Sequence, residues 1–304
     1  MLKDDVKRYI ELKYALGFKY RVQASLLNSF ANFSKLKGDR FVRTQTVLSW
    51  AAKAPSTPQR RNRLLTIRRF AKAIYAEDKR HQIPPDDAFG HQPYQRRMPH
   101  IFTPEELAVL LNAASDLEPN GSIRPAGYTT LFSLIAATGL RVSESLALQI
   151  DDITEDGLLI RSTKFRKSRL VPIHETVRCG LNKYLTVRER IAARDNAVFV
   201  SLKGTALCYS TVNHVFLNLV RSIGLRKESG RSGPRIHDLR HTFAVRSLEN
   251  CKENREEVAR HLVALSTYLG HTHVTDTYWY LQATPKLMNK IATANELVFK
   301  GGQS

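Results

Sequence analysis

Long apolar runs and paired cysteines are both missing from this 304-residue chain. No stretch approaches the ~20 apolar residues of a membrane span, and the N-terminus carries charges where a signal peptide needs an apolar segment. Cys179, Cys208 and Cys251 are odd in number and form no CxxC pair, which argues against a disulfide framework and a thiolate zinc site. We therefore expect a soluble cytoplasmic protein that has no membrane partner and keeps its cysteines reduced.

Acidic residues are also scarce. The chain has 28 Asp or Glu against 47 Lys or Arg, which gives a formal net charge of +19. Such a surplus indicates a polyanionic partner, most often nucleic acid, and leaves association with ribosomes or membrane surfaces as the alternative. Residues 1–100 hold 21 of the basic residues and 8 of the acidic ones, so this smaller part of the chain is the more basic one.

The length predicts two domains, and residues 1–80 predict a helical first domain. Large apolar residues recur there at steps of four and three before Gly38. They are Val22, Leu26, Phe30, Phe33 and Leu36. This spacing is typical of one buried helix face, and the glycine predicts where the helix ends.

A second helix is predicted after Pro58. Its apolar side consists of Leu64, Ile67, Phe70, Ala71 and Ile74. Its basic side consists of Arg61, Arg68, Arg69 and Lys72. One side can then pack while the other lies along DNA phosphates. A merely solvated face is the alternative for each residue taken singly, although hardly any acid is interleaved.

Prolines and a glycine between residues 81 and 100 exclude a helix or a central strand and indicate a linker. The sequence thus predicts a helical domain over 1–85, a linker over 86–100 and a second domain over 101–304, whose apolar C-terminal segment either docks on a neighbouring protomer or packs on its own domain. Thr103-Pro104-Glu105-Glu106 predicts the first helix start of that domain. An apolar helix ending at Gly139, a strand pair around 158–173 and further helices follow.

Six polar residues of the second domain stand in order within short motifs. They are Arg141, which follows Thr138-Gly139-Leu140 and precedes Ser143-Glu144; Lys164, which follows Ser162-Thr163 and precedes Arg169-Leu170-Val171-Pro172; His237 and Arg240 in His237-Asp238-Leu239-Arg240-His241; His271 after Leu269-Gly270; and Tyr280, nine positions after His271. In this combination and order the chain resembles the tyrosine recombinases of the phage integrase family.

These residue types suit phosphodiester transfer. A tyrosine hydroxyl can attack phosphorus and keep the bond energy in a phosphotyrosine. Two guanidiniums suit the nonbridging oxygens as charge develops on them, and a lysine can protonate the leaving 5′ oxygen. His237 and Arg240 stand three apart, so one helix would present both from the same face, and Gly270 can end a helix in a left-handed cap that orients His271.

The resemblance assigns the roles to positions. It implies Tyr280 as nucleophile, Arg141 and Arg240 as the phosphate clamp, Lys164 as general acid, and two donors or proton-transfer partners, His237 and His271. It also implies a mainly α fold with a small antiparallel β-sheet (α+β), in which a helical SAM-like core-binding domain precedes a mixed α/β catalytic domain. No cofactor or metal is expected.

Alternatives remain for two of these residues. Lys167 competes with Lys164 as the general acid. Two basic residues, Arg166 and Arg169, lie near Lys167 in the sequence and indicate a strand that touches DNA phosphates. Tyr268 and Tyr278 lie close to Tyr280 in the sequence; if 275–281 is helical, Tyr278 and Tyr280 point about 200° apart. The spacing in the family favours Lys164 and Tyr280.

Two further features have more than one interpretation. His237 with His241, and His271 with His273, have the spacing of metal pairs, but no carboxylate or cysteine stands at ligand spacing beside them. The stretch 250–261 is an insertion relative to compact family members, and it is charged and helix-prone. It either extends a helix at an interface with a partner or is a surface insertion without a function.

The sequence therefore predicts a bacterial, nucleoid-associated site-specific recombinase of a mobile element, acting in integration, excision or transposition. Four protomers would pair two double-stranded DNA sites through phosphotyrosine intermediates and a Holliday junction, with an accessory or partner recombinase as a further partner. The rivals are a DNA-relaxing enzyme like the type IB topoisomerases and a non-catalytic DNA-binding accessory protein.

Overall fold

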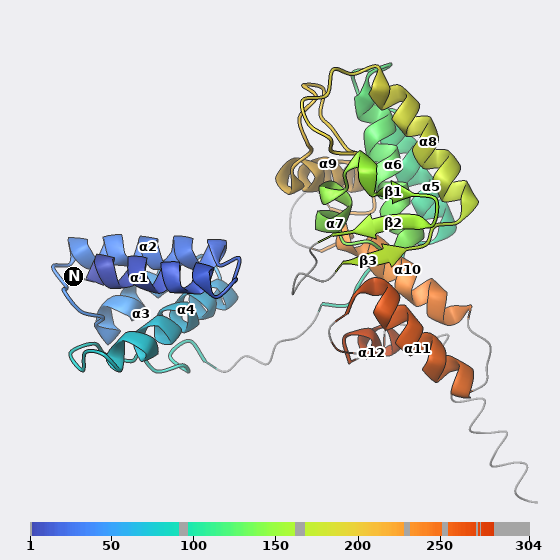
Figure 1. Cartoon of the computed structure of the whole chain (residues 1–304). Coiled ribbons are helices and arrows are strands. Elements are labelled where there is room, and N and C mark those ends of the chain that lie inside the picture. Colours follow the sequence, from blue (N-terminus) through green and yellow to red (C-terminus); the bar gives the residue numbers. More distant parts are fainter. Residues whose placement is uncertain are drawn as a thin grey trace, which may run out of the picture. The chain divides into compact units, whose positions relative to one another are not determined.

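The computed structural model describes residues 2–90, 97–161, 168–227, 232–250, 255–271, 273 and 275–282. The chain divides into two compact units, Met1–Arg96 and Arg97–Ser304, which are described separately below (Figure 1). Both are mainly helical, and the second also contains a small antiparallel sheet. The predicted fold class is thereby confirmed.

The N-terminal unit packs its helices around one apolar core. The helices are α1 (Leu2–Ala15), α2 (Arg21–Leu36), α3 (Thr44–Ala52) and α4 (Thr57–Tyr75). All five residues of the predicted apolar side of α4 are buried, with exposed fractions from 0% to 4%. Burial of such side chains, at roughly 1.5–3 kcal/mol for each large one, explains why this amphipathic segment folds as a helix against α2 and α3.

The predicted buried face of α2 is confirmed in its middle, where Phe30 is buried and Leu26 and Phe33 pack against the core, and wrong at both ends. The helix ends at Leu36, as predicted, but Val22 is 65% exposed and Leu36 is 86% exposed. The buried face is turned about the helix axis and consists of Ala24, Leu27, Phe30, Ala31 and Ser34. Small side chains on this face let α2 approach the neighbouring helices closely, a requirement that a pattern of large apolar residues does not reveal.

The stretch after α4 has neither helix nor strand up to Gly90. It is nevertheless anchored at its start, because the buried His81 accepts a hydrogen bond at Nδ1 from the Val42 N–H at 3.1 Å, and the Gln82 N–H donates to the Val42 carbonyl. Of the predicted linker over 86–100, residues 91–96 lie outside the described part of the chain. The division between the units falls between Arg96 and Arg97.

The second unit begins with the predicted helix start. Thr103 accepts from the Glu106 N–H and Glu106 accepts from the Thr103 N–H, which forms a complete capping box. The helices are α5 (Pro104–Ser115), α6 (Ile123–Thr138), α7 (Val142–Ala147), α8 (Glu175–Glu189), α9 (Tyr209–Ser222), α10 (His237–Glu249), α11 (Arg255–Leu269) and α12 (Thr275–Gln282). Figure 1 shows α6 beside α5 and α8.

The sheet consists of β1 (Ile153–Thr154), β2 (Gly157–Ile160) and β3 (Arg169–Val171) in that order, with antiparallel pairing throughout. A short 3-10 helix, η1 (Ile150–Asp152), precedes it. The predicted strand pair is confirmed, whereas β1 was not predicted. Ile160 pairs with Arg169, and the residues between them that include Lys164 lie outside the described part of the chain.

Two apolar clusters build the second unit. The larger involves α5, α6, α8, α9 and the sheet, with Phe132, Phe199 and Phe216 fully buried. The smaller joins α10, α11 and α12 and includes Leu269 and Tyr280.

Among the described residues, no helix has both the length and the apolar character required to cross a bilayer.

Candidate active site

A tight turn between α6 and α7 places Arg141. Gly139 has a φ of 62° in the left-handed region, and a Cβ on it would lie 2.4 Å from Cδ1 of Phe243. Only glycine satisfies both the backbone conformation and this close packing. The turn ends at Arg141, which occupies the N-cap position of α7 with extended backbone. The motif Thr138-Gly139-Leu140-Arg141 is therefore a structural device for presenting one arginine.

Arg141 is held on two sides and remains partly open to solvent. Its Nη1 donates to Oε1 of Glu144 at 2.6 Å and its Nη2 donates to the Gly270 carbonyl at 2.9 Å. The exposed fraction of its side chain is 32%. Part of the side chain therefore remains in contact with solvent, where an anionic group can approach it.

Arg240 lies one turn into α10 and is only 1% exposed. Its Nη1 donates to the Gly139 carbonyl at 2.5 Å, and its Nη2 donates to the Leu269 carbonyl at 2.8 Å. Burial, followed by the nearby charge of Arg141, lowers the pKa of Arg240 to about 10. The side chain thus remains a cation at neutral pH, buried and fixed by backbone carbonyls from two distant segments.

His271 follows the predicted left-handed cap, since Gly270 has a φ of 66°. The Nε2 of His271 lies 3.0 Å from Nη2 of Arg240, and its Nδ1 lies 2.8 Å from Oγ1 of Thr277. A guanidinium only donates, so Nε2 must accept and the proton of the neutral ring belongs on Nδ1. Burial, then Arg240 and Arg141, lowers the pKa of His271 to about 4, which keeps the ring neutral near pH 7.

Tyr280 lies on α12 and is 3% exposed. Its ring stacks on that of His271, with centroids 6.1 Å apart, and a tilted contact to His241 has centroids 5.4 Å apart. Burial raises the pKa of Tyr280, whereas the charge of Arg240 and a hydrogen bond with Arg240 act in the opposite direction. The hydroxyl is thus protonated at neutral pH and lies beside a fixed cation.

His237 is the first residue of α10 and keeps more than a third of its surface in solvent. Its ring meets that of His241 edge to face at a centroid distance of 4.8 Å. Despite this exposure, the pKa of His237 is lowered to about 4, first by partial desolvation of the ring and then by the charge of Arg240. His237 and Arg240 both lie in α10, three residues apart; His237 is exposed, whereas Arg240 is buried.

The structure therefore brings five of the six predicted residues into one neighbourhood. They are Arg141, His237, Arg240, His271 and Tyr280. The sixth, Lys164, lies outside the described residues, as do Arg166 and Lys167. Among the competitors of Tyr280 as nucleophile, Tyr268 is hydrogen-bonded from its hydroxyl to the Pro172 carbonyl at 3.4 Å, while the side chain of Tyr278 is not part of the described structure.

The sequence interpretation missed what Glu144 and Arg169 do. The Arg169 fork donates to both oxygens of Glu144, from Nη1 at 3.1 Å and from Nη2 at 2.8 Å. Burial alone would raise the pKa of Glu144, but the hydrogen bonds from Arg169 and Arg141 lower it to about 2. The position of Glu144, three residues after a helix start, signals a capping box. No local signal reveals Arg169, whose side chain is 15% exposed and is not available for the predicted contact with DNA phosphates.

The predicted basic side of α4 separates into two pairs. Arg61 donates to the Gly90 carbonyl at 3.0 Å, and Arg68 donates to the Pro84 carbonyl and lies 3.6 Å from Asp86. Both arginines therefore secure the segment after α4. The other pair, Arg69 and Lys72, is exposed.

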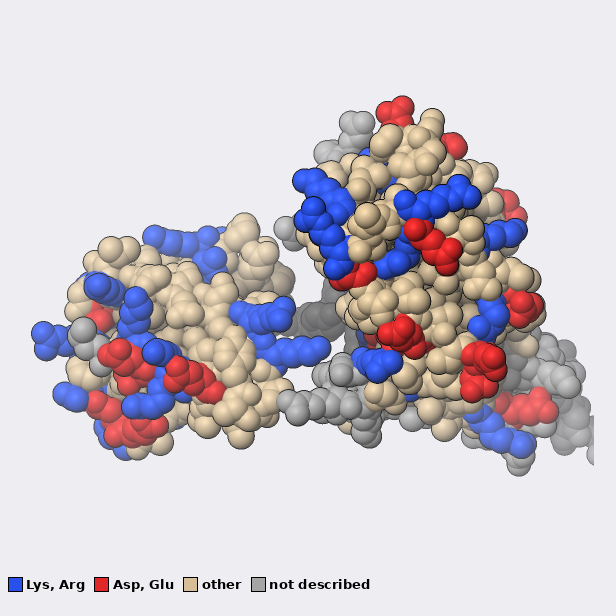
Figure 2. Space-filling view, turned by 45° about the horizontal axis from the view of Figure 1, so that its top comes forward, with Lys and Arg blue, Asp and Glu red and all other residues tan. Residues whose placement is uncertain are grey.

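Charge on the N-terminal unit is not uniform. Figure 2 shows acidic and basic side chains interspersed on one of its faces. Arg8 pairs with Glu77 at 2.6 Å, and Arg80 pairs with Asp78 at 2.8 Å. Because these basic side chains have acidic partners, the basic surplus available for a polyanion lies elsewhere in the unit.

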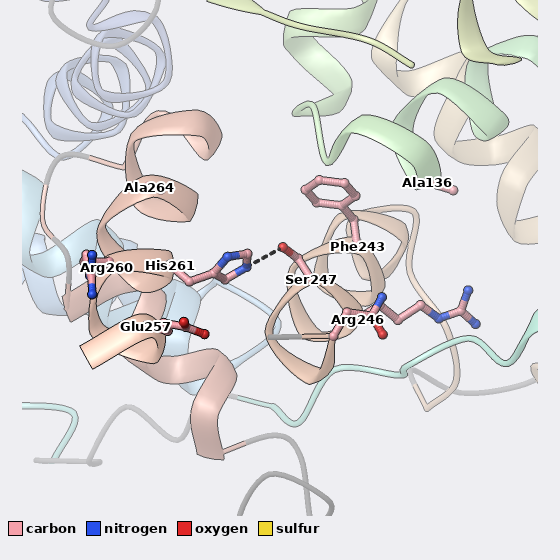
Figure 3. Close-up of a pocket in the computed structure, with 9 residues that line it drawn as sticks. Ala136, Phe243, Arg246, Ser247, Glu257, Arg260, His261 and Ala264 are labelled. Carbon is pink, nitrogen blue, oxygen red and sulfur yellow. Dashed lines mark hydrogen bonds between the residues drawn. The ribbon is translucent and has the colours of Figure 1, made fainter. Parts of the chain in front are cut away.

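A pocket of about 790 Å³ lies between α10 and α11, on the side of α10 that carries Phe243 and Ser247. Figure 3 shows His261 reaching across from α11 to Ser247, with Nε2 and Oγ 3.0 Å apart. None of the described candidate residues lines this pocket. It is therefore separate from the site described above, although both use the same helix.

In the described part of the chain, no group of three or more His, Cys, Asp or Glu side chains is placed to hold a metal ion.

Known proteins resemble this chain in sequence and in fold. The family model described as "Phage integrase family" matches residues 100–286, more than half of the chain. A protein of Sinorhizobium fredii (strain NBRC 101917 / NGR234), provisionally named integrase/recombinase y4rB, is 38% identical over 296 residues, which cover 94% of each chain.

Solved structures share the fold. The XerH site-specific recombinase bound to palindromic difH substrate, in a post-cleavage complex, has a TM-score of 0.64 at 23% identity, over 90% of this chain and 78% of that one. A lambda integrase tetramer bound to a Holliday junction has a TM-score of 0.66 at 16% identity, over 91% and 76%. At such identities the likeness concerns the fold alone.

Proposed function

This chain belongs to the phage integrase family, and we propose that it is a site-specific tyrosine recombinase that cuts and rejoins DNA strands through a 3′-phosphotyrosine intermediate. The observation that carries the proposal is the convergence of Arg141, Arg240, His271 and Tyr280, from four separate elements, around the C-terminal end of α11. Neighbouring cations and a buried tyrosine hydroxyl are the groups that a phosphate diester needs for transfer to tyrosine.

The two arginines form the phosphate clamp. Arg240 is preorganised by backbone carbonyls and Arg141 by Glu144 and a carbonyl, so neither must reorganise as charge develops on the nonbridging oxygens. Preorganised donors of this kind contribute more in a water-poor site than in solution. The low pKa of His271 keeps its ring neutral. Because its one proton lies on Nδ1 beside Thr277 and Nε2 accepts from Arg240, His271 serves as a proton-transfer partner, whereas His237 serves as a donor or proton-transfer partner.

In the transfer step the Tyr280 oxygen bonds to phosphorus, and the bond between phosphorus and the 5′ oxygen of the next nucleotide breaks. The tyrosine hydroxyl loses its proton to a neighbouring base or to solvent, and Lys164 donates a proton to the leaving 5′ oxygen. Attack by a 5′ hydroxyl of the partner strand reverses these steps and releases the tyrosine. No energy-rich cofactor is consumed.

The proposal extends to assembly and to biology. Four protomers would pair two double-stranded sites and pass through a Holliday junction, in line with the matching structure of a lambda integrase tetramer bound to such a junction. A role in moving a mobile element is supported by the relative named as an integrase/recombinase, which matches over nearly its full length. The N-terminal unit would act as the core-binding domain and the second unit as the catalytic domain.

A nicked half-site suicide substrate tests the proposal. The full chain is incubated with it, and covalent protein–DNA complex is measured on a denaturing gel. We expect a complex whose attachment maps to Tyr280, and, with two full sites, exchange of strands. Attachment together with relaxation of supercoiled DNA, but without exchange, would favour the topoisomerase-like alternative. Binding without any attachment would favour the accessory protein.

A further inference from the structure

Three consecutive backbone carbonyls at the C-terminal end of α11 each accept a hydrogen bond from a different arginine. The pairs are Tyr268 with Nε of Arg169 at 3.0 Å, Leu269 with Nη2 of Arg240 at 2.8 Å, and Gly270 with Nη2 of Arg141 at 2.9 Å. Carbonyls at a helix end lack partners within the helix and carry partial negative charge. The end of α11 is thus a common anchor for both clamp arginines and for Arg169.

Arg169 differs from Arg240, which is also buried, in the groups that it contacts: Arg240 meets His271 and Tyr280, whereas the described donors of Arg169 reach only Glu144 and the Tyr268 carbonyl. Its Nε takes the Tyr268 carbonyl, and Nη1 and Nη2 take the two carboxylate oxygens of Glu144. Its side chain is 15% exposed. A Cβ on Gly270 would lie 2.7 Å from Nη1 of Arg169, so the left-handed glycine before His271 also makes room for this guanidinium.

We infer that Arg169 is a positioning residue that sets the geometry of the phosphate clamp without contacting the substrate. It acts on two sides at once. Through Glu144 it fixes the carboxylate that orients Arg141, and through the Tyr268 carbonyl it fixes the end of α11 that orients Arg240 and precedes His271. This inference rests on the proposed function.

The fork shape of the guanidinium is essential to this role. One planar group spans a carboxylate and a carbonyl that belong to different elements, α7 and α11. A lysine ammonium carries the same charge but is a point donor on a flexible stem, and it cannot reproduce both contacts in a fixed plane. Arg169→Lys should therefore keep the ion pair with Glu144 and lose the positioning.

The test compares single-turnover cleavage by wild type, Arg169→Ala and Arg169→Lys on three half-site substrates. One carries the natural phosphate. The second has a methylphosphonate at the scissile position, which lacks one anionic oxygen and so needs less from the clamp. The third has sulfur in place of the leaving 5′ oxygen, which departs without a proton donor. DNA affinity and its salt dependence are measured in parallel.

For both variants we expect about a 10²-fold slower cleavage of the natural phosphate, the size of loss that a small misplacement of catalytic groups produces. DNA affinity should stay near that of wild type. The loss should be markedly smaller on the methylphosphonate and unchanged on the sulfur substrate, because the clamp and not the general acid is disturbed.

Arg178→Ala is the matched control. Arg178 is likewise a guanidinium that secures the small sheet through carbonyls, those of Thr154 and Glu155 at 2.9 and 2.6 Å, but it contacts no candidate residue in the described structure. We expect normal cleavage from it on all three substrates. Denaturant unfolding of each variant shows whether it is folded, and Arg169→Lys, which keeps the buried charge paired, remains informative if Arg169→Ala does not fold.

Four outcomes would overturn the inference. They are near-normal cleavage by Arg169→Lys; an equal loss on all three substrates, which indicates general damage to the fold; rescue by sulfur alone, which indicates an action on the general acid; and a fall in the salt slope of binding by about 0.9, which indicates a direct phosphate contact. Failure of wild type to attach to any substrate would instead reject the proposed function.

Discussion

Nη2 of Arg141 donates a hydrogen bond to the carbonyl of Gly270, 129 residues further along the chain, at 2.9 Å. This single contact joins the turn that follows α6 to the cap that ends α11. Arg240 makes a parallel connection, since it donates to the carbonyls of Gly139 and Leu269 on the same two segments. The two glycines therefore serve the site twice, through their left-handed backbone and through the carbonyls that they offer to the clamp.

Tyr280→Phe should abolish covalent attachment to a suicide substrate while leaving DNA affinity close to that of wild type. The variant removes one buried hydroxyl and keeps the ring stacked on His271, so the fold should be retained. Gel analysis of covalent complex and a binding titration measure the two quantities. Tyr268→Phe is the control, and it should attach normally. Full attachment by Tyr280→Phe would move the nucleophile to Tyr278 or Tyr268.

Arg141→Ala and Arg240→Ala should each slow cleavage by orders of magnitude. Removal of one preorganised donor at a developing oxyanion typically costs ~3–4 kcal/mol. Arg240→Lys should rescue poorly, because one ammonium cannot hold the carbonyls of Gly139 and Leu269 together. Single-turnover rates decide the matter. If Arg240→Lys cleaves at a near-normal rate, the fork geometry is not what the site uses.

Lys164→Ala should be rescued selectively by a substrate with sulfur at the leaving 5′ position. A thiolate departs without protonation, so the loss caused by a missing general acid should largely disappear on that substrate. The rate ratio between the oxygen and sulfur substrates is the measurement. The same defect on both would show that another group supplies the proton, and Lys167→Ala is then the variant to test.

The exposed residues Arg69 and Lys72 of α4 should contribute more to DNA affinity than Arg61 and Arg68, which are bonded to carbonyls. Arg69→Ala with Lys72→Ala removes two exposed charges, so the slope of log affinity against log salt should fall by about 0.9 for each phosphate that the variant no longer neutralises. Arg61→Ala with Arg68→Ala removes side chains already bonded to carbonyls and should change the slope less. An unchanged slope in both double variants would place this side of α4 away from DNA.

Acid should destabilise the protein over a defined window. The pKa of His271 is lowered by burial to about 4, against ~6.5 for an unperturbed histidine. Between these values the unfolded chain binds a proton that the folded chain does not, so the free energy of unfolding falls as the pH drops from ~6.5 to about 4. His271→Gln should flatten part of this fall in denaturant titrations, since His81, His237 and His241, whose pKa values are also lowered, contribute to it as well. The exposed His214→Gln serves as control, and equal curves for all three proteins would contradict the argument.

Local rules explain why much of the fold was predictable from the sequence. Helix starts and ends depend on nearby residues, and the capping box at Thr103, the helix end at Gly139 and the left-handed cap at Gly270 were all predicted in place. The face of α2 was predicted only in part, through Leu26, Phe30 and Phe33, because burial of Ala24 and Ser34 depends on how closely the neighbouring helices approach. Periodicity alone cannot report that distance.

For the candidate site, too, local relations along the chain were predictable from the sequence and contacts between distant segments were not. Order and spacing within the sequence determined which residues to consider, since the nine-residue step to Tyr280 and the three-residue step from His237 to Arg240 are local relations along the chain. Only the tertiary structure decided which arginines lie beside His271 and Tyr280. Arg169 lies within a basic stretch and would pass for a DNA contact, yet its guanidinium is taken by Glu144 and the Tyr268 carbonyl. Hydrogen-bond partners that lie 25 and 99 residues away are set by how the elements pack, and no local pattern encodes them.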